Sequence, residues 1–289
     1  MIEKLRQAMI KQGLDMLIVV SGDEHLNEYL PVQNWRLRAS TKSGSSAGFS
    51  GSAGTAIICV EGRSQLFVDS RYHLQAEQSC AENFDIMKLG NEGVPEPQKW
   101  ISAQTEKTLK VGADPFVMSP KEWRRYENAI GKFGHTLLPT TPNLVDTVWD
   151  NRPNPPQKEI YPLALKYTGK ESADKLQDIR KEMNESGIQD DSKLDVLLLT
   201  MLDEIAWLTN LRGSDIEYNP VFEAYAAIFQ DRALCFCHHP DANLSEHCPE
   251  WEFRPYAEYL GFLEQLAQEE AVKVWLDPST ITMGTRMAF

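Results

Sequence analysis

The sequence predicts an α/β protein built from two similar domains, each a mixed β-sheet flanked by helices. Two observations support this class. Helical and strand patterns alternate along the chain, and the two halves repeat the order helix, strand, turn, hairpin. A proline-rich segment near the middle of the 289 residues separates the halves, in agreement with the length expected for two domains.

The helices are predicted from apolar residues that recur at helical spacing. The segment after Ser119 is the clearest case, because Ser119 suits the N-cap, Pro120 suits the first helical position, and Trp123, Tyr126 and Ile130 share one face. By the same criteria, helices are expected over residues 2–12, 70–80, 97–104, 120–132, 172–186 and 256–268.

The two halves match at a constant offset. Residues 14–17 (LDML) match residues 194–197 (LDVL), and Asp23-Glu24 matches Asp203-Glu204, each 180 positions later. The later stretches "TAIICVEGRSQLFVD" and "YAAIFQDRALCFCHH" both contain a strand, a charged turn and a second strand, which is typical of a β-hairpin. We therefore expect an internal duplication.

The segment between the halves, "NRPNPPQ", holds three prolines in seven residues. Proline fixes φ and removes a backbone donor, so this stretch is unsuited to a helix or an inner strand. We predict domains over residues 1–152 and 161–289, joined by a proline-rich linker over residues 153–160.

Composition argues against several classes of partner. The chain has 42 acidic and 29 basic residues, a net charge of −13, which disfavours nucleic acid and anionic membranes. No apolar run approaches the ~20 residues that a membrane span needs, and the N-terminus lacks the layout of a signal peptide. Five irregularly spaced cysteines favour a reduced compartment over a disulfide framework. We expect a cytoplasmic protein.

A glycine-rich stretch, "GFSGSAGTA" from Gly48 to Ala56, raises the question of phosphate binding. Its pattern is neither that of a dinucleotide loop nor that of a nucleotide-triphosphate loop. It also leads into a strand, whereas phosphate loops lead into the N-terminus of a helix. We expect a tight entry into that strand, where the backbone approaches its neighbours closely.

The most metal-like cluster lies near the end of the second hairpin, where Cys235, Cys237 and His238 are good zinc ligands by type. The alternative is that both cysteines lie on the buried face of a strand, because residues two apart in a strand share a face. We favour the buried face and keep zinc binding as the alternative. The acidic pairs Asp23-Glu24 and Asp203-Glu204 are expected at helix N-termini, where the helix dipole favours negative charge.

Four arginines at predicted loops or element ends are better candidates for ligand binding: Arg36, Arg38, Arg71 and Arg212. An arginine can hold a peptide carbonyl or carboxylate through charge-assisted hydrogen bonds. A structural ion pair or a helix C-cap remains the alternative for each of them.

Three stretches carry a family resemblance: "SGDEHLNEYLPVQNWRLR", "GFSGSAGTAIICVEGRSQLFVDSRYHLQAEQ" and "TMLDEIAWLTNLRGSDIEYNPVFEAYAAI". Together they resemble the cytosolic, eukaryotic-type Xaa-Pro aminopeptidases (aminopeptidase P) of the creatinase/prolidase superfamily. The resemblance runs over nearly the whole chain, and it implies two creatinase-type N-terminal domains, in agreement with the duplication.

The resemblance also implies where catalysis takes place. Members of the family have a third domain that holds two metal ions, usually manganese, on two Asp, one His and two Glu. This chain stops at Phe289, before that domain would begin, and the metal ligands have no counterpart in it. We therefore expect no cofactor, metal ligand or catalytic residue in this chain, and no activity of the chain alone.

One family contact carries over to this sequence. The arginine of the family's DGRY motif reaches the substrate peptide, and here the motif reads "DSRY" from Asp69, with Ser70 replacing glycine and Arg71 as the substrate-binding residue. Residues proposed at the substrate entrance are Arg36, Arg38, Tyr72 and Arg212.

The implied partners are peptides with proline at the second position, the protein's own catalytic domain, and a second copy in a homodimer. The alternative is a stand-alone, non-catalytic module that binds peptides.

Overall fold

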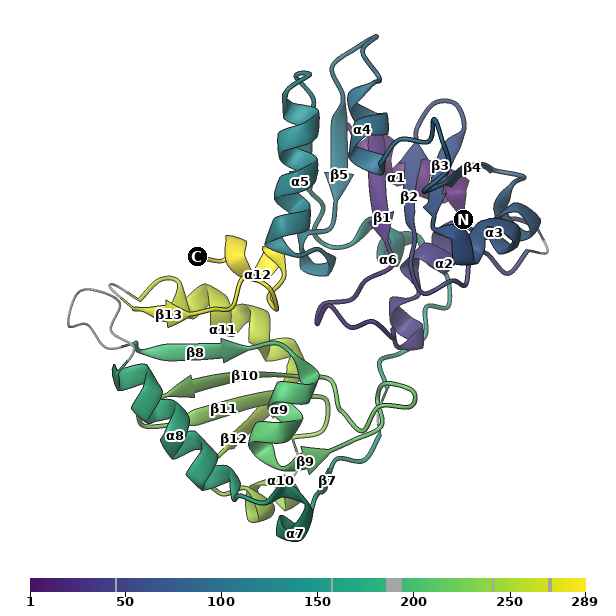
Figure 1. The fold of residues 1–289 in the computed structure, drawn as a ribbon. Helices are drawn as coiled ribbons and strands as arrows, with labels where there is room; N and C mark the ends of the chain where they lie inside the picture. The colour runs from purple at the N-terminus through teal and green to yellow at the C-terminus, as the bar shows by residue number, and fades with distance from the viewer. Residues whose placement is uncertain (45, 157, 186–193, 241, 270–271) are drawn as a thin grey trace. The chain divides into compact units, whose positions relative to one another are not determined.

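The computed structural model describes residues 1–44, 46–156, 158–185, 194–240, 242–269 and 272–289 (Figure 1). The chain forms two compact units. Unit 1 contains Met1–Pro155 together with Thr282–Gly284, and unit 2 contains Pro156–Ile281 together with Thr285–Phe289. The assignment of three residues near the C-terminus to unit 1 is not foreseen by a linear division of the chain.

Unit 1 contains a six-stranded mixed sheet in the order β4-β3-β2-β1-β5-β6. The strands are β1 (Met16–Val20), β2 (Thr55–Cys59), β3 (Ser64–Val68), β4 (Phe84–Lys88), β5 (Lys110–Ala113) and β6 (Thr136–Pro139). β1 pairs antiparallel with β2 and parallel with β5, and β2 and β3 form the predicted hairpin.

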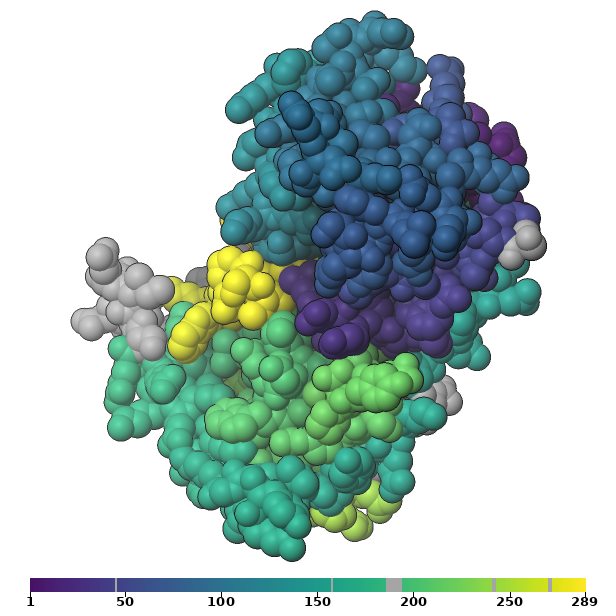
Figure 2. Space-filling view, turned by 45° about the vertical axis from the view of Figure 1, so that its right-hand side comes forward, coloured from purple at the N-terminus to yellow at the C-terminus, as the bar shows by residue number. Residues whose placement is uncertain are grey.

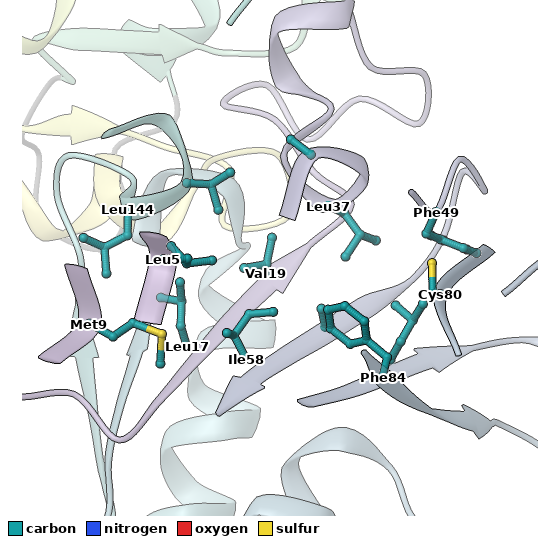
Figure 3. Packing of buried hydrophobic residues seen from close by; sticks show 14 of the residues in the cluster. Leu5, Met9, Leu17, Val19, Leu37, Phe49, Ile58, Cys80, Phe84 and Leu144 are labelled. Carbon is teal, nitrogen blue, oxygen red and sulfur yellow. The ribbon is translucent and has the colours of Figure 1, made fainter. Parts of the chain in front are cut away.

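Helices cover both faces of this sheet. They are α1 (Ile2–Lys11), α2 (Arg36–Ser40), α3 (His73–Cys80), α4 (Pro97–Ser102), α5 (Pro120–Gly131) and α6 (Leu144–Val148). Alternate residues of β1 face opposite cores, as the two-residue period of a strand requires. Leu17 and Val19 pack with α1, α2, α3 and α6 (Figure 3), and Ile18 packs with α4 and α5.

Unit 2 repeats this plan in a five-stranded sheet with the order β12-β11-β10-β8-β13. Its strands are β8 (Val196–Leu199), β10 (Ala224–Phe229), β11 (Ala233–Cys237), β12 (Glu252–Pro255) and β13 (Val274–Trp275). A separate two-stranded sheet joins β7 (Tyr161–Pro162) to β9 (Leu211–Arg212). The helices are α7 (Leu165–Thr168), α8 (Ser172–Glu185), α9 (Leu202–Thr209), α10 (Ala242–His247), α11 (Tyr259–Leu266) and α12 (Met283–Met287).

The two sheets confirm the predicted duplication. β8 pairs antiparallel with β10 and parallel with β13, as β1 does with β2 and β5. The hairpin β10–β11 extends to a parallel β12, as β2–β3 extends to a parallel β4. Five strands of unit 1 therefore have a counterpart in unit 2 with the same neighbours and directions.

Several helix boundaries differ from the prediction. The predicted helices over 70–80 and 256–268 each begin with a 3₁₀ turn, Ser70–Tyr72 and Tyr256–Glu258, and the second ends at Leu266. The other predicted ends shorten by one or two residues, as is usual where helices fray. Ser186, the predicted end of the helix from Ser172, lies outside the described residues.

Two further expectations concern cysteines and membranes. All five cysteines are free and buried, and Cys235 and Cys237 lie in the same apolar core, which confirms their predicted common face. Within the described ranges, no helix combines the length and the apolar character needed to cross a bilayer.

Candidate functional site

Arg71 lies on an exposed turn of unit 1 and is held by its neighbour Asp69. Asp69 follows β3 and caps the 3₁₀ turn Ser70–Tyr72 by accepting a hydrogen bond from the Arg71 backbone N–H at 3.0 Å. The same carboxylate accepts from Arg71 Nε at 3.0 Å and from Nη2 at 2.8 Å. The Arg71 side chain is 61% exposed, so the guanidinium is oriented and still accessible. The blue surface of unit 1 that includes α3 faces the viewer in Figure 2.

Asp69 and Arg71 are both charged over the whole physiological pH range. The hydrogen bond from Arg71 lowers the pKa of Asp69 below its usual value, and Asp69 in turn raises the pKa of Arg71. A guanidinium carries five N–H donors, of which Asp69 takes two. In the part of the chain that the structure describes, the guanidinium donates to no other protein group, which leaves three donors for a ligand or solvent.

The glycine-rich stretch packs against this turn through Tyr72. The Arg71 guanidinium lies 5.1 Å from the centre of the Tyr72 ring. The Tyr72 hydroxyl lies 2.8 Å from Ser52 Oγ, and the Tyr72 and Phe49 rings pack edge to face with their centres 5.6 Å apart. A Cβ on Gly51 would lie 2.4 Å from Phe49 and 2.8 Å from Tyr72. The absence of a side chain at Gly51 therefore allows Phe49 and Tyr72 to pack together, with Tyr72 next to Arg71.

Gly48 has a different requirement. Its φ is +78°, and an added Cβ would lie 2.2 Å from the carbonyl oxygen of Arg38. The stretch then enters β2 at Thr55. The predicted tight strand entry with close backbone approach is confirmed.

Arg38 lies in α2, ten residues before the glycine-rich stretch. Its Nε donates to the carbonyl of Ala47 at 3.3 Å, and its guanidinium lies 4.8 Å from the centre of the Trp35 ring. Trp35 is partly exposed. Arg38 therefore contacts the residue directly before the glycine-rich stretch, and Tyr72, adjacent to Arg71 in sequence, contacts Ser52 within it.

Arg36 is placed differently from the other candidates. It is 3% exposed and forms ion pairs with Glu24 at 2.6 Å and Asp146 at 2.9 Å. Burial alone would lower its pKa, but these two carboxylates outweigh burial and raise it. This geometry agrees with the structural ion pair that the sequence left open.

The expectation that Asp23 and Glu24 begin a helix is wrong. Asp23 is buried in a turn, where it accepts hydrogen bonds from the backbone N–H groups of His25 and Asn27, and Glu24 binds Arg36. The equivalent pair in unit 2, Asp203-Glu204, does lie in the first turn of α9, as predicted. Glu24 pairs with Arg36, which lies twelve residues later in the sequence. Helix-dipole reasoning does not anticipate such a partner.

Arg212 belongs to unit 2 and acts at the end of α9. Its Nη1 donates to the carbonyls of Ala206 and Leu211. The Ala206 carbonyl is one of the last four of α9, which a helix leaves without an intrahelical partner, whereas Leu211 belongs to β9. This is the C-capping alternative noted from the sequence.

The described residues contain no group of three or more His, Cys, Asp or Glu side chains able to hold a metal ion. Cys235 and Cys237 are both fully buried among apolar side chains. His238 Nε2 lies 3.1 Å from Glu223 Oε2, and its ring stacks on Tyr256 at 4.4 Å. The described side chains thus fit neither zinc nor a manganese pair, and we assign no metal-dependent step to them.

Asp69 is the residue of the candidate site that sequence reasoning does not identify. It is the first residue of the DSRY motif, two positions before Arg71. The spacing Asp-x-Arg is the signal that identifies it, because an aspartate in a turn accepts a hydrogen bond from the backbone N–H two residues later. Here the same carboxylate also accepts hydrogen bonds from the Arg71 guanidinium.

Two family matches cover almost the entire chain. Residues 1–148 and residues 151–289 each match a family described as the creatinase/prolidase N-terminal domain. The chain belongs to the creatinase/prolidase N-terminal domain family. Its two units are therefore two members of this family in tandem.

Curated relatives of this creatinase/prolidase chain are named as aminopeptidases. It is 38% identical over 272 residues to a probable Xaa-Pro aminopeptidase P of Botryotinia fuckeliana, covering 91% of this chain and 39% of the relative. It is 34% identical over 278 residues to aminopeptidase P2 of Arabidopsis thaliana, covering 94% and 37%. The chain thus spans less than half the length of these relatives.

A solved structure agrees in fold. The X-prolyl aminopeptidase from Caenorhabditis elegans, described as a cytosolic enzyme with a di-nuclear active site, matches with a TM-score of 0.85 and 23% identity. The match covers 98% of this chain and 47% of that one. The two-domain creatinase-type fold predicted from the sequence is confirmed, and the chain corresponds to the N-terminal region of Xaa-Pro aminopeptidase-like proteins.

Proposed function

We propose that this chain is the non-catalytic N-terminal region of a metal-dependent Xaa-Pro aminopeptidase. Its two domains, over residues 1–152 and 161–289 with a linker over 153–160, shape the substrate entrance and support a catalytic domain, and they offer a surface for a homodimer. The parent protein acts in the cytoplasm on peptides with proline at the second position. The parent's catalytic domain, rather than this chain, would hold two metal ions, usually manganese in this family, and these would supply Lewis-acid chemistry for hydrolysis.

The observation that carries this proposal is the fixed, exposed guanidinium of Arg71. Proline lacks a backbone N–H, so an Xaa-Pro peptide offers mainly carbonyl and carboxylate oxygens around its second residue. A guanidinium has donors only, and it matches such oxygens through charge-assisted hydrogen bonds. Because Asp69 already orients the side chain, less rotamer entropy is lost on binding.

The other proposed entrance residues differ in what supports them. Arg38 donates to Ala47, directly before the glycine-rich stretch, and Tyr72 contacts Ser52 within that stretch, and we retain both as entrance residues. Arg36 is buried between two carboxylates and Arg212 donates to carbonyls of α9 and of Leu211. We therefore propose structural roles for Arg36 and Arg212.

A cleavage assay with an Xaa-Pro peptide and added manganese tests the proposal. The 289-residue chain and the product of the full reading frame are compared at equal concentration. We expect cleavage only by a longer product that carries a catalytic domain. Cleavage by the 289-residue chain would contradict the proposal.

The second candidate is a stand-alone peptide-binding module. It is favoured by one observation: Asp69, Tyr72 and Ser52, which position Arg71, all belong to unit 1. Titration of the 289-residue chain with an Ala-Pro peptide tests it. Saturable binding that Arg71→Ala abolishes, with no cleavage by any natural form, would support the module over the enzyme region.

A further inference from the structure

A second candidate binding site lies on unit 2, separate from Arg71. A pocket of about 480 Å³ opens beside the first turn of α9. Its apolar lining comes from Ile179, Leu199 and Leu208, and its remaining lining residues are Asp203, Glu204 and Trp207. The Trp207 side chain is a large hydrophobic group with 52% exposure. Pockets of a few hundred Å³ with an apolar lining and few polar groups are typical ligand sites.

The pocket is lined by two acidic residues, Asp203 and Glu204. Partial burial raises the pKa of Glu204, and repulsion from Asp203 and Asp277 raises it further. Among the described residues, no Lys or Arg forms an ion pair with Asp203 or Glu204. Lys175 approaches the Trp207 ring at 4.5 Å, but its ammonium is buried and donates to the carbonyl of Trp207 and to Asn210 Oδ1, both at 2.6 Å. Lys175 is therefore committed to the end of α9 rather than to the two carboxylates.

The duplicated half indicates which cation fits. Glu24 follows the central strand β1 as Glu204 follows the equivalent strand β8, 180 positions later. In unit 1, an arginine of the chain itself occupies Glu24, with Arg36 Nη2 at 2.6 Å from its Oε1. The residue of unit 2 that lies 180 positions after Arg36 is Ile216, which is apolar and buried. Arg212, four positions before it, donates to backbone carbonyls rather than to Glu204. Unit 2 keeps the carboxylate without the internal guanidinium.

We propose that the pocket beside α9 binds the side chain of an arginine presented by another polypeptide. The aliphatic part of that side chain packs on Ile179, Leu199 and Leu208, and its guanidinium forms charge-assisted hydrogen bonds with Asp203 and Glu204. Trp207 provides an aromatic surface for the same guanidinium. Arginine is favoured over lysine because its planar fork matches carboxylates in two-point contacts and stacks on aromatic rings.

Three short peptides test this proposal by calorimetric titration of the 289-residue chain: acetyl-Gly-Arg-Gly-amide and the same peptide with lysine or citrulline. Citrulline has nearly the shape of arginine but carries no charge. We expect the arginine peptide to bind at least tenfold more tightly than the citrulline peptide, with lysine between them.

Variants assign the binding to this pocket. Asp203→Asn and Glu204→Gln are each expected to weaken binding of the arginine peptide about five- to tenfold, and Trp207→Ala at least as much. Glu264→Gln, a charge change at an exposed position of α11, is the matched control and should leave binding unchanged. Unfolding midpoints of all variants confirm that they are folded.

Equal binding of the arginine and citrulline peptides would overturn the proposal. So would arginine binding that persists unchanged in Asp203→Asn and Glu204→Gln, because the cation would then bind elsewhere.

Discussion

Asp15 and Asp195 make the same pair of hydrogen bonds in the two domains, 180 residues apart. The Asp15 N–H donates to the carbonyl of Lys110 at 2.9 Å, and Asp15 Oδ2 accepts from the Lys110 N–H at 2.8 Å. Asp195 does the same with Lys273, at 3.0 and 2.8 Å. Each aspartate thereby ties the start of the central strand to its parallel neighbour. The duplication extends to individual side chains.

We expect Asp15→Ala and Asp195→Ala each to destabilise its own domain by about 1–2 kcal/mol, because a hydrogen bond to a charged group contributes roughly that much. Hydrogen exchange locates the effect: β1 and β5 amides should lose protection in the first variant, and β8 and β13 amides in the second. Glu264→Ala is the control. A loss of protection spread evenly over both domains would contradict independent, equivalent roles.

Burial raises the pKa of Asp15, but hydrogen bonds from Lys107 and Lys110 outweigh this and hold the pKa below its usual value. Its contribution to stability is therefore present above the unfolded pKa of about 3.9 and is lost as the pH falls through the lower folded pKa. In urea unfolding, the difference between wild type and Asp15→Ala should shrink below about pH 4. A difference that grows on acidification would contradict this assignment.

Gly51→Ala is expected to cost about 1–3 kcal/mol of stability, because the new methyl group overlaps Phe49 and Tyr72. Displacement of Tyr72 should also loosen the Arg71 turn. Gly131→Ala is the matched control, since an added Cβ there meets nothing within 4 Å and the residue is helical. Urea unfolding measures both. Equal stability of the two variants would contradict the close packing described here.

Arg36→Met is expected to destabilise unit 1 by about 3 kcal/mol, because it leaves Glu24 without its cation in a buried site and leaves Asp146 with Arg152 as its remaining cation. Arg38→Met removes a more accessible arginine and should cost less than about 1 kcal/mol. Denaturant midpoints compare the two. If Arg36→Met leaves stability unchanged while peptide binding falls, Arg36 is an entrance residue after all.

Asp114 should make stability depend on pH in the opposite sense to Asp15. Burial raises the pKa of Asp114 to about 6, despite hydrogen bonds from Phe116 N and Asn143 Nδ2. Between about pH 4 and 6 the folded state binds the extra proton, so this group's contribution falls by about 2–3 kcal/mol as the pH rises. Asp114→Asn should remove this component between pH 4.5 and 7.5 in urea unfolding. Parallel pH profiles of variant and wild type would contradict it.

The fold was largely predictable because its elements are encoded by local patterns. The helix from Pro120 follows from its cap and its apolar face, and the duplication follows from matching strands at a fixed offset. Helix ends are less predictable: the 3₁₀ turn at Ser70 is capped by Asp69, which accepts a hydrogen bond from the Arg71 backbone N–H, and apolar periodicity does not report such a cap.

The candidate site was predictable only in part. Arg71 was identified through the family motif, and Asp69 is adjacent to it in sequence. Arg36 forms one of its two ion pairs with Asp146, which lies 110 residues away in the sequence. The pocket near Trp207 is lined by side chains from three elements, α8, β8 and α9. Long-range contacts of this kind leave no local pattern, and the helix-dipole argument consequently failed at Asp23 and Glu24.

The most direct test of the account is the effect of Arg71→Ala on kcat/KM for an Xaa-Pro peptide, measured in the full reading frame product once its activity is established. Loss of a charge-assisted contact predicts a reduction of about 10- to 100-fold, partial recovery in Arg71→Lys, and unchanged stability. Arg63→Ala, at another exposed ion-paired arginine of unit 1, should retain full activity. Wild-type kcat/KM in Arg71→Ala would contradict the central claim that this region contacts the substrate through Arg71.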